Sequence, residues 1–103
     1  MAEGRVLLVA EVSSEALPAV EFALRELLDG AIVHSQLGLH VEASVADGNP
    51  QDLNRQLLSA LRRVERRTRL RAEWTRDRTT YRFFDYVLKG SSPAIGSTNL
   101  TPG

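Results

Sequence analysis

The sequence predicts an α+β fold, a two-layer sandwich in which two helices pack on one face of a four-stranded mixed sheet. Two segments repeat apolar residues at the spacing of amphipathic helices, and the remaining segments have the β-branched or alternating patterns of strands. Each helix has a single apolar stripe, so we expect both helices to cover the same face of the sheet, in the order β-α-β-α-β-β.

The first strand is expected at residues 5–12, where apolar residues fall on both faces, as in a central strand that is covered on both sides. The first helix follows, with Pro18 in its first turn and Gly30 as its stop signal. Its apolar stripe consists of Leu17, Val20, Leu24, Leu27 and Leu28. Phe22 lies on the opposite side among acidic residues, either as a single exposed aromatic or as an interface anchor.

Residues 31–46 alternate apolar and polar side chains with period two, which predicts a strand with one buried face that includes Ala31 and Val33. We favour one long, bent strand, because the alternation keeps its phase, whereas a two-residue hairpin would change which residues face the core. A hairpin near Gly38 is the alternative, and it predicts a ferredoxin-like order.

The second helix has the clearest start in the chain. Asn49 is the expected N-cap, Pro50 the first helical residue and Asp52 an acid in the first turn. After this helix we expect an alternating strand that includes Trp74, and then a closing strand at 79–90 that is rich in aromatic and β-branched residues. Residues 1–89 are therefore expected to form a single domain, and residues 90–103 a flexible tail or the start of a linker.

Charge is strongly divided along the chain, although the formal net charge is zero. Residues 1–54 carry nine acids and two bases, a net charge of −7, and residues 55–103 carry four acids and eleven bases, a net charge of +7. Such opposed halves indicate charge-guided association, either within the fold or with a partner.

Part of the basic half is interpreted as a binding surface for an anionic partner, because a guanidinium group can hold a carboxylate or a phosphate with two hydrogen bonds. A solvated helix face, or pairing with acids of the first helix, would account for the same arginines without a partner. The zero net charge favours an acidic protein over nucleic acid. The predicted binding residues are Arg55, Arg62, Arg66, Arg69 and Arg71.

The sheet face away from the helices is expected to expose apolar side chains of the closing strand. A second copy of the chain is the expected occupant, because such a face usually binds something and closed homodimers are the commonest oligomers. The predicted interface residues are Phe22, Tyr81, Phe83, Phe84 and Tyr86.

The sequence contains no recognisable catalytic motif and no cysteine, which excludes disulfides, thiolate chemistry and cysteine zinc sites. His40 and Glu42 lie two residues apart on one strand face and could contribute to a cleft in a small ferredoxin-like dimeric enzyme or ligand-binding protein. We favour the simpler interpretation that both are ordinary polar residues on an exposed or dimer-facing strand. Asp85 stands in an apolar run and needs a partner if it is buried, and an arginine is the expected one.

These observations together predict a non-enzymatic protein-interaction or regulatory module without a cofactor or a metal. It is expected to homodimerise through its sheet and to bind an acidic partner through its arginines. A nucleic-acid-binding domain that uses the same arginines is the alternative. The sequence has no apolar run as long as a membrane span and no signal-peptide pattern, so we expect a cytoplasmic protein.

Overall fold

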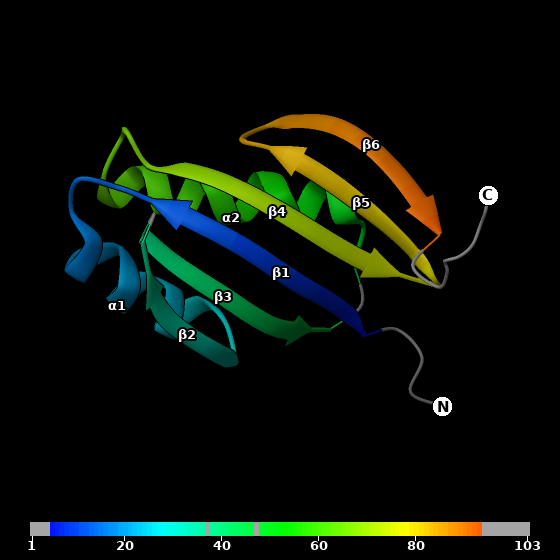
Figure 1. The fold of residues 1–103 in the computed structure, drawn as a ribbon, viewed down its shortest axis with the longest axis horizontal. Coiled ribbons are helices and arrows are strands. Elements are labelled where there is room, and N and C mark those ends of the chain that lie inside the picture. Colours follow the sequence, from blue (N-terminus) through cyan, green and yellow to red (C-terminus); the bar gives the residue numbers. More distant parts are fainter. Residues whose placement is uncertain (1–4, 37, 47, 94–103) are drawn as a thin grey trace.

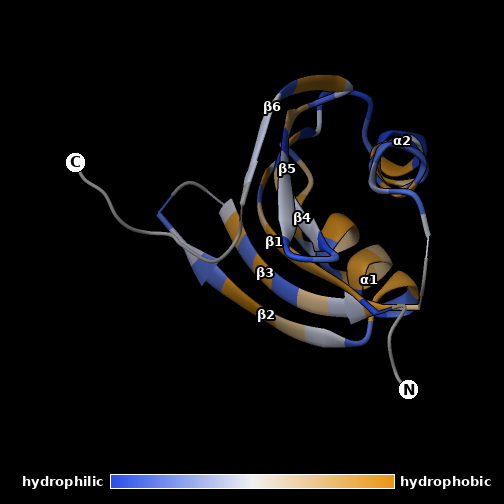
Figure 2. Ribbon diagram, turned by 90° about the vertical axis from the view of Figure 1, so that its right-hand side faces the viewer, coloured by the Kyte–Doolittle hydropathy of each residue, from blue (hydrophilic) through white to orange (hydrophobic). Residues whose placement is uncertain are grey.

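Six strands form one sheet with two helices on one of its faces in the computed structural model, which describes residues 5–36, 38–46 and 48–93 (Figures 1 and 2). The elements are β1 (Val6–Ser13), α1 (Leu17–Leu27), β2 (Gly30–Ser35), β3 (Gly38–Val45), α2 (Pro50–Val64), β4 (Arg69–Arg76), β5 (Thr79–Phe84) and β6 (Val87–Pro93). The strand order is β2-β3-β1-β4-β5-β6, and every neighbouring pair is antiparallel. The predicted α+β fold is therefore confirmed, but the sheet has six strands rather than four and is antiparallel rather than mixed.

The hydrophobic core lies between the helices and the face of the sheet that they cover (Figure 2). Alternate residues of β1 and β4 point into this layer, which is the reason that every second residue in these strands is buried. Trp74 of β4 is almost fully buried, and its indole nitrogen donates to the Oδ1 of Asn54 on α2 over 3.1 Å. This hydrogen bond ties α2 to the sheet and satisfies two polar groups that would otherwise be buried without partners.

Helix α2 begins where the sequence predicts. The Oδ1 of Asn49 accepts hydrogen bonds from the backbone nitrogens of Gln51 at 2.8 Å and of Asp52 at 3.3 Å, so Asn49 caps the free amides of the first turn. Within the described part of the chain, neither helix has the length and apolar character needed to cross a membrane.

The run 31–46 is a hairpin of β2 and β3, and the prediction of one long strand is wrong. The prediction placed Ala31 and Val33 on the buried side, whereas the structure buries Ile32 and leaves Val33 54% exposed. The buried positions change from even-numbered residues in β2 to odd-numbered residues in β3. Residues 31–33 are all apolar, so the sequence pattern does not show this change. The elements from β1 to β4 consequently follow the order β-α-β-β-α-β that the hairpin alternative predicted.

The predicted closing strand at 79–90 is also divided into two strands. The chain turns at Asp85, whose φ of 55° lies in the left-handed region that aspartate tolerates better than most residues. Strand β6 then returns along β5 and continues to residue 93, so residues 90–93 of the expected tail belong to the sheet. The rest of that tail, 94–103, lies outside the described residues.

Candidate interaction surface

No helix of the described residues lies on one face of the sheet, and we call this face the open face. It is turned toward the viewer in Figure 1, with α2 behind the sheet. In β1, Leu7 and Val9 are 53% and 42% exposed on this face, while their neighbours Leu8 and Ala10 are buried under the helices. Among the described residues, β1 is therefore covered on one side only, contrary to the expectation of cover on both.

A row of six residues crosses the open face from edge to edge, and each member is the cross-strand partner of the next. Cross-strand partners project from the same face of a sheet. The row therefore presents, in order, an apolar residue, a histidine, an acid, a base, an aromatic ring and an apolar residue. This central row consists of Val33 (β2), His40 (β3), Glu11 (β1), Arg71 (β4), Phe84 (β5) and Val87 (β6).

The midpoint of the central row separates an acidic half of the open face from a basic half. The half formed by β2, β3 and β1 carries Glu11 and Glu42, and the half formed by β4, β5 and β6 carries Arg69, Arg71 and Arg82. Groups of the opposite sign in each half are already engaged with neighbours. Arg5 donates to the Ser44 hydroxyl over 2.9 Å, and Glu73 pairs with Arg82 at 3.5 Å.

His40 lies between two carboxylates in the acidic half. Its Nδ1 is 2.5 Å from Glu11 Oε2, and its Nε2 is 2.9 Å from Glu42 Oε2. Only the protonated ring can donate to both carboxylates at once. Hydrogen bonding with Glu11, and then with Glu42, therefore raises the pKa of His40 above its ordinary value.

The His40 cluster gives no independent sign of a metal or ligand site. No group of three or more histidine, cysteine or acidic side chains within the described residues could hold a metal ion. His40 is also not among the residues that line the two grooves of about 500 Å³ and about 330 Å³ on the open face. It is 30% exposed as a side chain and faces solvent beside these grooves.

In the basic half, Phe84 is flanked by two guanidinium groups. The Cζ of Arg69 lies 5.3 Å from the centre of the Phe84 ring, and the Cζ of Arg71 lies 5.5 Å from it, both within the range of cation–π attraction. Arg69 also pairs with Asp85 at 3.0 Å. Arg71 makes no ion pair with a described residue, so its positive charge remains available on the open face.

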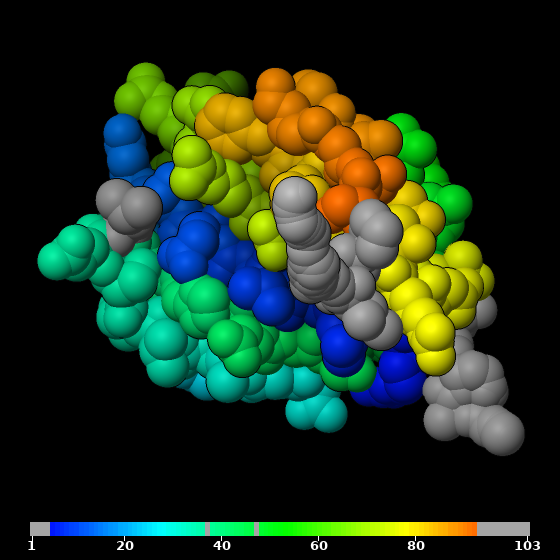
Figure 3. Space-filling model, turned by 45° about the vertical axis from the view of Figure 1, so that its right-hand side comes forward, coloured from blue at the N-terminus to red at the C-terminus, as the bar shows by residue number. Residues whose placement is uncertain are grey.

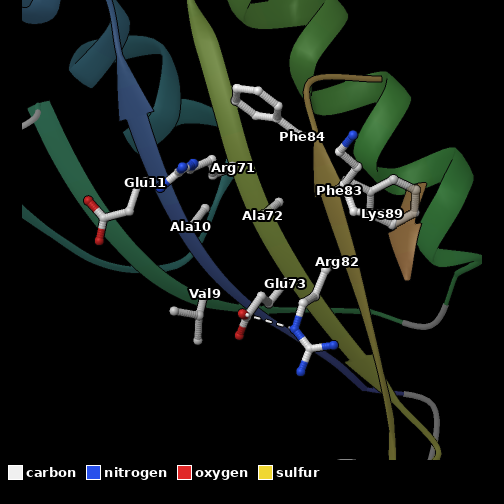
Figure 4. Close-up of a pocket in the computed structure, with 10 residues that line it drawn as sticks. All are labelled: Val9, Ala10, Glu11, Arg71, Ala72, Glu73, Arg82, Phe83, Phe84 and Lys89. Atoms are coloured by element: carbon white, nitrogen blue, oxygen red, sulfur yellow. Dashed lines mark ion pairs between the residues drawn. The ribbon is translucent and has the colours of Figure 1, made fainter. Parts of the chain in front are cut away.

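A groove of about 500 Å³ runs over β1, β4 and β5, beside the start of β6 (Figure 4). Its polar walls include Glu11, Arg71, Arg82 and Lys89. Figure 4 shows the Glu11 carboxylate turned toward β3 and away from Arg71, while Glu73 reaches Arg82. The lining of the groove therefore includes one guanidinium group, that of Arg71, which makes no ion pair with a described residue.

The structure does not bring the five predicted binding arginines together on one surface. Arg55 lies on α2 and pairs with Asp52 at 2.6 Å. Arg62, also on α2, is half-buried and donates to the backbone oxygen of Thr68 over 2.9 Å. Arg66 is exposed just after α2, whereas Arg69 and Arg71 project from the open face, on the other side of the sheet.

Asp85 neutralises two of the predicted binding arginines. It pairs with Arg69 and, at 3.4 Å, with Arg62, as expected for an acid within an apolar run. The acids of the first helix contribute little to this neutralisation. Arg67 reaches Glu15, just before α1, at 3.3 Å, and both side chains of that pair are largely exposed.

The predicted interface residues are also distributed over different surfaces. Phe84 alone belongs to the open face, whereas Phe83 is buried in the core and Tyr81 packs against that core. Tyr86 lies against α2, where its hydroxyl is 3.2 Å from Ser59 and its ring is under Arg62. Phe22 is 66% exposed on α1, on the opposite side of the molecule from the open face.

The exposed apolar residues of β1 and the central acid Glu11 were missed as candidate site residues. Their signal was present, because Leu7 and Val9 make β1 apolar on both faces. That pattern was interpreted as a sign that other elements of the same chain cover both faces of β1. In Figure 3, β1 lies at the surface between β3 and β4, with no helix over it.

The chain was compared with protein-family models, with curated proteins and with solved structures. None of the three comparisons gave a match. The function of the protein therefore has to be argued from the open face itself.

Proposed function

We propose that the protein is a non-enzymatic interaction module that forms a homodimer through the open face of its sheet. The observation that carries this proposal is the set of exposed apolar side chains on that face. Apolar residues of four different strands are between 36% and 56% exposed there, which is unusual for one side of a sheet in a monomer. These residues are Leu7, Val9, Val33, Phe84 and Val87.

The open face is large enough for a stable dimer. Six strands about 4.8 Å apart and about seven residues long define a plane of roughly 650 Å². Side chains increase that area, and a standard interface buries about 800 Å² on each partner. Two such sheets can pack face to face about 10 Å apart with their strands nearly aligned.

The charge on the open face favours a second copy over a partner of uniform charge. An acidic protein or a nucleic acid would be repelled by the half that carries Glu11 and Glu42. A second copy offers both signs of charge in equal measure. The predicted arginine surface also lies on two layers of the molecule, which weakens it as a single binding site for an anionic partner.

The test is the oligomeric state of the wild-type protein and of a variant with a more polar open face. Sedimentation equilibrium over a range of concentrations should show a dimer for the wild type. The double substitution Leu7→Thr and Val9→Thr places β-branched threonine, which favours strands, at both positions but removes apolar contact area, and it should weaken dimerisation by at least about tenfold.

Leu27→Gln is the matched control, because Leu27 is 50% exposed on α1 and lies away from the open face. This variant should dimerise as the wild type does. A wild type that stays monomeric at the highest soluble concentration would refute the proposal. So would a double variant that is folded by circular dichroism and dimerises with unchanged affinity.

A further inference from the structure

We infer that the two copies are related by a two-fold axis that runs parallel to the strands, midway between β1 and β4, so that each Glu11 meets the partner's Arg71. This inference rests on the proposed homodimer and specifies its geometry. It follows from the order of side chains along the central row and from the charges that the single chain leaves unmatched.

An axis in this position lays one half of the open face on the opposite half of the partner. Residues at equal distances from the axis then face each other. Glu11 and Arg71 are direct cross-strand partners on either side of it, so each stands opposite the other residue of the second copy. One step outward, His40 meets the partner's Phe84, and two steps outward Val33 meets the partner's Val87.

All three contacts in this arrangement are favourable. A carboxylate meets a guanidinium group, a histidine held between two carboxylates meets an aromatic ring, and two apolar side chains meet at the edge. The adjacent row agrees with this pairing, because Glu42 stands opposite the partner's Arg82. Val9 then faces the partner's Glu73, whose carboxylate is already paired with Arg82 at 3.5 Å.

The charged groups that have no neutralising partner within the described part of one chain favour the same pairing. The cluster of Glu11, His40 and Glu42 has two carboxylates and one imidazole, so it is negative whether or not the ring is protonated. On the other side of the axis, Arg71 has no acidic partner among the described residues. A dimer with this axis supplies each of these groups with the opposite charge from the second copy.

The other simple two-fold axis for face-to-face sheets runs perpendicular to the strands, and charge argues against it. That axis would lay the acidic half on the partner's acidic half and the basic half on the partner's basic half. With that axis on the central row, Glu11 would meet the partner's Glu11 and Arg71 the partner's Arg71, and like charges opposed in an interface are strongly unfavourable. Sheet twist makes rows diverge with distance from the axis, so the pair next to it, Glu11 with Arg71, is the most informative one.

The inference can be tested by reversing one charge at a time and then mixing the variants. Glu11→Arg turns each of the two pairs into an arginine opposite an arginine, and Arg71→Glu turns each pair into a glutamate opposite a glutamate. Each variant alone should dimerise at least about 100-fold more weakly than the wild type. An equimolar mixture should form a heterodimer, because both of its contacts then join a glutamate to an arginine. Native mass spectrometry with one variant labelled with nitrogen-15 would detect it.

Three further variants provide a control and a reserve pair. Glu15→Arg makes the same charge change on the helix side of the molecule, where Glu15 is exposed, and should leave dimerisation unchanged. If either variant at the axis fails to fold, Glu42→Arg and Arg82→Glu provide a second pair that the same axis brings together. Folding of each variant is checked by circular dichroism.

The outcomes separate this inference from the proposal on which it rests. The axis is wrong, and the homodimer proposal stands, if the wild type is a dimer but its folded charge variants form homodimers as strongly as it does. The same conclusion follows if the two variants do not combine when they are mixed. A monomeric wild type would overturn both. Weak homodimers that combine into a heterodimer would support the axis.

Discussion

His40 illustrates at the scale of a single residue how neighbouring strands set the chemistry of a side chain. The hydrogen bond with Glu11, and secondarily that with Glu42, raises the pKa of His40 above the 6.5 of a free histidine. The folded chain thus binds the His40 proton more tightly than the unfolded chain does. This contribution to stability is complete below pH 6.5 and is lost as the pH rises through the higher pKa of the folded state.

We therefore expect the free energy of unfolding to fall from about pH 6.5 upward in the wild type, and to fall less in His40→Gln. Urea denaturation at a series of pH values, at a protein concentration where the chain is monomeric, measures this difference. Proton NMR of the His40 ring should give a higher pKa in the folded state than in urea, and Glu11→Gln should reduce the difference. Identical pH profiles for the wild type and His40→Gln would contradict the expectation.

Some residue-scale features could be predicted from the sequence because they depend on local chemistry. Asn49 caps α2 through amides only two and three residues away, and the pattern that predicts it needs no distant partner. The candidate site was less predictable. Phe83 and Phe84 are adjacent and equally apolar, yet one is buried and the other lies on the open face, because neighbouring strand residues point to opposite sides.

At the scale of elements, both errors in the number of strands arose at turns that lack a strong local signal. The turn between β5 and β6 depends on contacts with β4. The backbone nitrogen of Asp85 donates to the Leu70 oxygen over 2.7 Å, and the Asp85 carboxylate accepts from the Leu70 nitrogen over 2.9 Å. Residues 15 positions apart make these contacts, so a local pattern cannot reveal them. The turn between β2 and β3 was hidden instead by the apolar residues on both faces of β2.

The Asp85 turn provides a test at this scale. Asp85→Ala should lower the free energy of unfolding by about 3 kcal/mol, because it leaves Arg62 and Arg69 without their acid and puts alanine into a left-handed conformation. Asp85→Asn should cost about 1 kcal/mol less, since asparagine tolerates that conformation and can still accept from Leu70. Urea denaturation of the variants at one protein concentration measures both effects.

Asp77 is the matched control, because it has nearly the same φ, 54°, in the turn between β4 and β5. Its side chain is 78% exposed, and the ion pair that it makes with Arg76 is 4.0 Å long. Asp77→Ala should therefore cost only about 1 kcal/mol, the backbone part of the effect. Equal losses for Asp77→Ala and Asp85→Ala would mean that the contacts of the Asp85 carboxylate contribute nothing measurable.

At the scale of the whole molecule, the division of charge in the sequence becomes a division of the open face. Strands β1, β2 and β3 all come from residues 6–45, and strands β4, β5 and β6 all come from residues 69–93. The strand order keeps each group together, with β1 and β4 side by side at the middle of the sheet. The charge asymmetry could be read from the sequence, but its location on one face required the strand order, which depends on long-range pairing.

This arrangement predicts a limited dependence of dimerisation on salt. The two pairs of Glu11 with the partner's Arg71 are expected to contribute about 0.5 kcal/mol each at low salt, and an increase from about 0.05 M to about 0.5 M NaCl screens much of that. The dimer dissociation constant should then rise by about fivefold and level off, because the contacts of Leu7, Val9 and Val33 do not depend on screening. Sedimentation equilibrium at several salt concentrations measures the change. The double variant Glu11→Gln and Arg71→Gln should show a flatter response, and a wild type with the same flat response would indicate that these two charges do not meet across the dimer.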